Sequence, residues 1–155
     1  GISLPDKMRE EMSYTAKRVS DQAHQELTPE WIYQIFCDNY INVDKKFHIT
    51  ECHFVQEDGI QAKATVESEG RTAVINGQGN GRLDAVSNAI RSYLDVDYEL
   101  VDYEQHSLTK GSSSKAVSYV SITKDGQTFW GVGIDEDIIK SSYQALEVAV
   151  NKILD

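Results

Sequence analysis

The sequence has few cysteines and no long apolar run. Cys37 and Cys52 are its two cysteines, and they show neither a CxxC motif nor the Cys/His spacing of a zinc site. No apolar run approaches the roughly 18 residues that cross a bilayer, and we recognise no signal peptide. These absences argue against a disulfide framework and a membrane segment. We therefore expect a cytoplasmic protein whose cysteines are small buried hydrophobic residues.

Basic residues are also scarce. The 155 residues include 15 Lys and Arg against 25 Asp and Glu, which gives a formal net charge of −10. Nucleic-acid binding needs clustered positive charge, so we expect no nucleic-acid partner. The chain opens with Gly1 instead of Met, which suggests a fragment of a larger protein or a residual cloning glycine. Its length suits a compact domain with a small attached piece.

The small attached piece is predicted at residues 1–45 and is helical. A helix over 5–22 follows from apolar residues at three- and four-residue spacing, namely Leu4, Met8, Met12, Ala16 and Val19. Residues 20–27 are polar and predict a connection. Thr28 then suits a helix N-cap with Pro29 at the first helical position. Two short helices cannot bury the large apolar residues Trp31, Ile35 and Phe36 of the second helix, so we expect another surface of the parent protein to cover part of them.

The rest of the chain, residues 46–155, has the period of strands followed by helices. The first unit predicts three strands and a helix, over 47–55, 60–66, 71–76 and 83–94. The second unit repeats this order, over 98–106, 116–122, 127–132 and 135–154, with a Gly/Ser-rich loop at 109–114. We therefore define two repeats, 47–94 and 98–154.

A constant offset of 56 residues aligns the two repeats without a gap. It places five residues of the first repeat on chemically similar residues of the second, namely Gly70 on Gly126, Thr72 on Thr128, Gly77 on Gly133, Leu83 on Ile139 and Ala89 on Ala145. Two such units can bury their apolar faces by packing around a pseudo-two-fold axis. The predicted fold is therefore α+β, an internal duplication of a βββα unit with two three-stranded sheets and two helices.

The same offset contrasts the two helix starts. Gly79-Asn80-Gly81 aligns with Asp135-Glu136-Asp137. Glycines that adopt positive φ would expose backbone N–H groups to a carboxylate, and the aspartates would accept an ammonium group. Such a pair suits a zwitterionic amino acid. The alternative is that the glycines only form a turn and the aspartates only complement the helix dipole; the local pattern leaves both open.

Other candidate sites are weaker. Glycines at 77, 79 and 81 do not form GxGxxG in a βαβ unit, so a dinucleotide site is not predicted. His48 and His53 lie an odd number of residues apart on a strand, which argues against joint metal binding. Tyr103 and His106 would suit acid/base chemistry, but no nucleophile or paired carboxylate accompanies them.

Three motifs together resemble the C-terminal regulatory domain of 2-isopropylmalate synthase. They are Gly77-Gln78-Gly79-Asn80-Gly81-x-x-Asp84-Ala85, then Tyr98-x-x-x-x-Asp102-Tyr103-x-x-His106, then Trp130-Gly131-Val132-Gly133-Ile134-Asp135-x-Asp137-Ile138. The resemblance covers residues 47–155 in order. Residues 1–45 are similar to the helical linker subdomain of the longer form of that enzyme.

The resemblance implies a regulatory function. In that family a TIM-barrel domain condenses acetyl-CoA with 2-oxoisovalerate using a divalent metal, and paired regulatory domains of a homodimer bind L-leucine and inhibit the enzyme. This chain would then catalyse nothing alone and hold no cofactor. Its expected partners are L-leucine, a second copy of itself and the catalytic barrel.

The implied leucine site consists of ten residues, namely Gly79, Asn80, Gly81, Leu83, Leu100, Tyr103, Ser107, Ser114, Ile134 and Asp135. Ser107 and Ser114 depart from the family pattern, because small apolar residues suit a leucine side chain better than hydroxyls do. Isoleucine sensing, as in the similar citramalate synthase, therefore stays open, as does a dimerisation module that binds no ligand.

Overall fold

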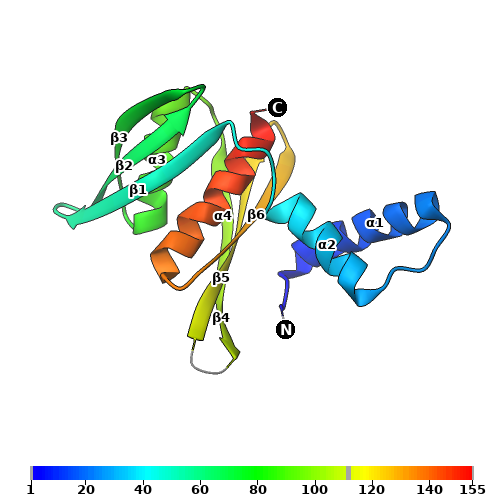
Figure 1. The fold of residues 1–155 in the computed structure, drawn as a ribbon. Coiled ribbons are helices and arrows are strands. Elements are labelled where there is room, and N and C mark those ends of the chain that lie inside the picture. The colour runs from blue at the N-terminus through cyan, green and yellow to red at the C-terminus, as the bar shows by residue number, and fades with distance from the viewer. Residues whose placement is uncertain (1, 111–112, 155) are drawn as a thin grey trace.

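The computed structural model describes residues 2–110 and 113–154 (Figure 1). These residues form α1 (Asp6–Ala23), α2 (Pro29–Tyr40), β1 (Phe47–Gln56), β2 (Ile60–Ser68), β3 (Arg71–Gly79), α3 (Arg82–Leu94), β4 (Glu99–Lys110), β5 (Ser113–Lys124), β6 (Gln127–Asp135) and α4 (Ile138–Ile153). The predicted α+β class and the order of two βββα units after a helical segment are confirmed.

The starts of the N-terminal helices follow from local sequence. Pro5 precedes the first residue of α1, and Thr28 caps α2 by accepting a hydrogen bond from Trp31 N at 3.1 Å. Helix α1 continues through Ala23 and ends with His24 in the left-handed region at φ 54°. The prediction of a connection from residue 20 was therefore wrong for 20–23, because a polar stretch on an exposed helix face carries no apolar period.

The six strands form two antiparallel sheets with strand orders β1-β2-β3 (the first sheet) and β4-β5-β6 (the second sheet). The turn before the last strand of each sheet has the same conformation, with φ 53° and 75° at Glu69-Gly70 and 52° and 77° at Asp125-Gly126. These pairs lie 56 residues apart, so the turns obey the predicted repeat. Two consecutive residues at positive φ are typical of a type I′ hairpin turn.

The β4–β5 hairpin is longer than its counterpart in the first repeat. Register shifts occur between Ile49 and Glu51 in β1 and between Leu100 and Asp102 in β4, which lie 51 residues apart instead of 56. Five additional residues therefore extend the second hairpin, which projects beyond the N-terminal end of α4 in Figure 1. The predicted loop at 109–114 is wrong where the structure describes it, because β4 runs to Lys110 and β5 begins at Ser113; residues 111–112 lie outside the described chain.

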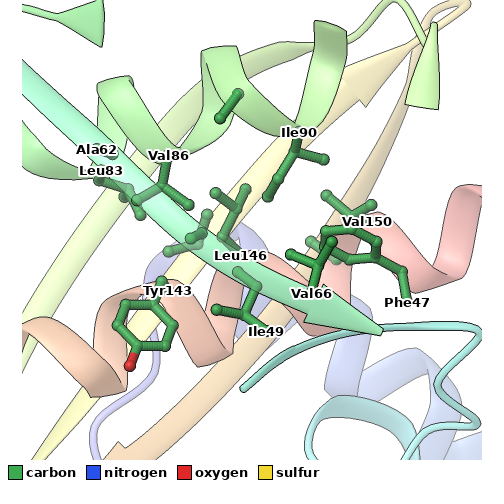
Figure 2. Close-up of a cluster of buried hydrophobic side chains, with 14 of the residues drawn as sticks. Phe47, Ile49, Ala62, Val66, Leu83, Val86, Ile90, Tyr143, Leu146 and Val150 are labelled. Atoms are coloured by element: carbon green, nitrogen blue, oxygen red, sulfur yellow. The ribbon is translucent and has the colours of Figure 1, made fainter. Parts of the chain in front are cut away.

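The main core lies where the two sheets and their helices meet. Helix α3 packs on the first sheet and α4 on the second, and the two helices contact each other. Figure 2 shows that they run in the same general direction, with Leu83 and Tyr143 towards one end of the cluster and Ile90 and Val150 towards the other. Both helix N-termini therefore point to the same end of the molecule.

A second core covers the opposite face of the second sheet. Its buried members come from α1, α2, β5 and β6, and are Met8, Met12, Ile35, Phe36, Tyr40, Val117, Tyr119, Trp130 and Val132. The chain thus buries Ile35, Phe36 and Tyr40 of α2, whereas Ile32 and Tyr33 of the same helix are 40% and 53% exposed. The other surface that we expected to cover part of Ile35 and Phe36 is the second sheet of this chain, because β5 and β6 carry apolar side chains on both faces.

Candidate functional site

Glycines 77 and 79 lie in β3 beneath α3. An added Cβ at Gly77 would come within 3.0 Å of Ala85 O and Ala89 N, and one at Gly79 would lie 2.8 Å from Ala85 N. The glycines with positive φ are 59, 70 and 126 in the described chain, so the prediction that glycines 77–81 adopt positive φ was wrong. Glycine is required at 77 and 79 because the helix backbone approaches the strand closely.

The start of α3 leaves backbone donors exposed. Gly81 is the N-cap residue in extended backbone at φ −135°, and no side chain of the described residues caps the helix. Asn80 N donates to Asp84 Oδ2 at a long 3.4 Å, while Leu83 is buried just inside the first turn. The first-turn N–H groups and the positive end of the helix dipole are therefore available to an anion.

The start of α4 is already capped. Asp137 is the N-cap residue, and its Oδ1 accepts from Ile139 N at 2.9 Å and Lys140 N at 3.2 Å. The helix begins at Ile138, so Asp137 is the one of the three predicted carboxylates that caps it.

Asp135 does not cap α4. It is the last residue of β6, and its carboxylate contacts three neighbouring residues. Its Oδ1 accepts from Asp137 N at 2.9 Å, and its Oδ2 lies 3.3 Å from Gln144 Nε2 and 3.9 Å from Lys140 Nζ. One quarter of the side chain is exposed. Asp135 thus presents an oriented carboxylate at the position where the first repeat has Gly79.

Three of the predicted site residues lie on the face of the second sheet that α4 covers. Tyr103 and Ser107 are each two residues from Gln105 on β4, so they share its face, and Gln105 contacts α4. Ser114 is four residues before Ser118 on β5 and shares the same face. All three side chains are exposed, Tyr103 by 44%. Asp135 joins this group, since it lies opposite Ala116 in β5, which in turn pairs with Ser107.

Two predicted residues lie elsewhere. Leu100 is seven residues before Ser107 on β4, a separation of roughly 20 Å along a strand, and it packs against the main core. Ile134 pairs with Val117 and packs against the second core, on the other face of the sheet. One copy of the chain therefore does not bring all ten predicted residues around one small ligand.

Comparison with known proteins identifies the family. The family described as LeuA allosteric (dimerisation) domain matches residues 26–154. The chain belongs to this family. It is 41% identical to a 2-isopropylmalate synthase of Helicobacter hepaticus over 163 aligned positions, which cover 99% of this chain and 29% of that protein. It is 43% identical to a 2-isopropylmalate synthase of Desulfitobacterium hafniense, with 99% and 28% covered.

The resemblance to the regulatory domain of 2-isopropylmalate synthase is thereby confirmed. The chain spans less than a third of the length of these relatives, and the family match is to the allosteric and dimerisation part. None of the helices in the described ranges has the length and apolar character to cross a membrane.

Gln105, which lies between two of the predicted site residues on β4, was not singled out from the sequence. Gln105 Nε2 lies within hydrogen-bond distance of Ser118 Oγ (2.9 Å), Ile138 O (2.9 Å) and Ser141 Oγ (3.3 Å). It fixes the start of α4 against β4, between Tyr103 and Ser107. A long amide side chain on the helix-covered face of a strand was the available signal, but only the register reveals which face that is.

The weaker candidate sites stay separate in this LeuA-family domain. Tyr103 and His106 lie an odd number of residues apart on β4 and face opposite sides. His106 instead lies 3.7 Å from Glu104, and its ring is tilted by 59° against that of Tyr119, whose pKa burial raises to about 12. His48 and His53 contact different carboxylates, and the described residues contain no group of three metal-ligating side chains.

Proposed function

We propose that this domain binds L-leucine between the N-terminal ends of α3 and α4 and thereby inhibits a catalytic domain in the same, longer polypeptide. The observation that carries the proposal is that the two repeats differ chemically at the equivalent starts of α3 and α4. The first repeat offers uncapped N–H groups at Gly81 and beyond, and the second offers the oriented carboxylate of Asp135. An α-carboxylate suits the former and an α-ammonium the latter.

A second copy of the chain would complete the site. Tyr103 and Ile138 are 44% and 54% exposed, and Gln105, two residues after Tyr103 on β4, donates to Ile138 O, so two large apolar side chains lie open near the start of α4. The family is described as a dimerisation domain, which supports self-association. Residues that one copy holds far apart, such as Leu100 and Ser107, would then contribute from different copies to the paired sites of a homodimer.

The parent activity follows from the relatives. Because those relatives are named 2-isopropylmalate synthase, we infer that the parent polypeptide transfers the acetyl group of acetyl-CoA to 2-oxoisovalerate in the cytoplasm. The divalent metal of that reaction would belong to the catalytic domain. The 155 residues here would sense the end product.

Calorimetric titration of the chain with L-leucine, L-isoleucine and L-valine tests the proposal. We expect leucine to bind most tightly. Leucinamide, which lacks the carboxylate, and 4-methylvalerate, which lacks the ammonium group, should each bind at least about tenfold more weakly, since each loses a charge-assisted hydrogen bond. No heat with any amino acid at millimolar concentration would leave a dimerisation module without a ligand. Tighter binding of isoleucine would reassign the effector.

A further inference from the structure

Glu147 is a buried carboxylate on the inner face of α4. Its side chain is 1% exposed, and its Oε1 accepts from Ile49 N and lies 2.9 Å from His48 Nδ1. Its Oε2 lies 2.9 Å from Lys45 Nζ. Lys45 belongs to the segment that joins the helical subdomain to the first sheet, and His48 and Ile49 lie at the start of β1 in that sheet. None of the three belongs to the second sheet, on which α4 packs.

Asn151 holds the same segment one helical turn later. Its Oδ1 accepts from Lys46 N at 2.7 Å and Phe47 N at 2.9 Å, and its Nδ2 donates to Phe47 O at 2.8 Å. Positions i and i+4 share one face of a helix, so the two side chains act together. We call Glu147, Asn151 and the residues 45–49 that they hold the clamp.

Lys152 extends the contact of α4 to the helical subdomain itself. Its Nζ lies 4.4 Å from the centroid of the Tyr40 ring, at the last residue of α2, and donates to Trp130 O. The Tyr40 hydroxyl donates to Glu11 Oε1 at 2.8 Å, which links α2 to α1. The C-terminal half of α4 is thus bonded to the junction between the two parts of the chain.

A buried ion pair is a poor source of stability, because desolvation offsets much of the attraction. Its geometric effect is to favour the arrangement in which Lys45, His48 and Ile49 N all contact Glu147. The same helix carries Asp137 at its start, ten residues before Glu147, which is about 15 Å along the helix axis. One rigid element therefore joins the proposed leucine site to the clamp.

We infer that α4 transmits occupancy of the leucine site to the helical subdomain, and that Glu147 is the positioning residue of this coupling. The inference rests on the proposed function. A ligand shifts an equilibrium only through unequal affinity for two arrangements. A displacement of the start of α4 moves Glu147 and Asn151. Because these side chains hold residues 45–49, the displacement also changes the conformation of residues 45–49 and the position of α2.

Hydrogen–deuterium exchange of the whole 155-residue chain, with and without saturating L-leucine, measures the coupling. In the wild type, leucine should change the exchange rates of amides 29–49 by about fivefold or more. In Glu147→Gln, and in the milder Lys45→Met, that ratio should fall below about twofold. The leucine Kd from calorimetry should stay within about threefold of wild type, because neither residue touches the site.

Glu51→Gln is the matched control, since it removes a carboxylate that contacts a histidine, His53, at 2.7 Å on the exposed face of β1. It should keep the wild-type ratio. If the clamp only stabilises the fold, Glu147→Gln would raise the exchange rates equally with and without leucine. The ratio of the two rates would then equal that of wild type, which would overturn the inference. If Glu147→Gln fails to fold, Lys45→Met decides. Absence of leucine binding in the wild type would instead refute the proposed function, and this inference with it.

Discussion

Replacing Gly133 with alanine tests the reason for glycine in the strands of both repeats. The added Cβ would lie 2.8 Å from Ala145 N and 2.9 Å from Gln144 Cβ, and closer still to Ser141 O. Two of these neighbours are backbone atoms of α4, which no side-chain rotation can move. The helix would have to retreat from β6 by about 1 Å to restore ordinary contact.

The cost of that retreat follows from what α4 buries. Leu146, Ala149 and Val150 are fully buried on its inner face, so a displaced helix opens gaps around all three. Forcing one carbon into a filled core costs typically 1–3 kcal/mol, and a backbone clash belongs at the upper end, about 3 kcal/mol. For a chain of this length the melting temperature should fall by about 6–12 °C.

Urea and thermal unfolding followed by circular dichroism measure the loss. Gly77→Ala is the matched variant of the first repeat, because its Cβ would meet Ala85 O and Ala89 N, and it should cost as much. Gly81→Ser is the control, since a Cβ there meets nothing within 4 Å and a serine suits an N-cap. A Gly133→Ala protein within 1 kcal/mol of wild type, or an equal loss in Gly81→Ser, would refute the close-approach explanation.

Three further outcomes are expected. Gly81→Asp should weaken leucine binding by more than about tenfold in calorimetry, because a negative charge enters beside the amides of α3 at a position where an added Cβ meets nothing within 4 Å; unchanged affinity would contradict the proposed site. Thr28→Ala should lower the free energy of unfolding by about 1 kcal/mol in urea, because Trp31 N loses its acceptor. Burial lowers the pKa of Lys152 from 10.5 to about 8, so the native state loses this proton at a lower pH than the unfolded state does. The stability of wild type relative to Lys152→Met should therefore rise from pH 8 to about 10 in parallel urea titrations; a constant difference would contradict this.

Much of the fold was predictable because local and repeated patterns agreed. Alternation gave the strands, Thr28-Pro29 gave the start of α2, and the offset of 56 tied Gly77 to Gly133. The last match has a physical cause, because each glycine lies under the same residues of its helix, Ala85 and Ala89 in one repeat and Ser141 and Ala145 in the other. The long β4–β5 hairpin was not predictable, since Ser and Gly near 111–114 also suit a loop.

The candidate site was predictable only in part. Sequence comparison of the repeats found the difference between Gly79 and Asp135, but could not separate the capping role of Asp137 from the orientation of Asp135. A glycine that permits close packing and one that permits positive φ look alike in a sequence. Glu147 and Asn151 stood in an apolar helix face as isolated polar residues, and only the tertiary structure shows that both hold residues 45–49.

The separation of roles among the glycines has a consequence for design and for evolution. Gly77 and Gly133 set the spacing between helix and strand, whereas position 81 and its counterpart Asp137 face open space or solvent at the helix ends. If the proposed leucine site is correct, substitutions at position 81 therefore change what the domain recognises without disturbing the contact between helix and strand. A duplicated unit of this kind can acquire two unlike halves of one receptor, and engineers seeking a sensor for another amino acid can vary the helix ends first.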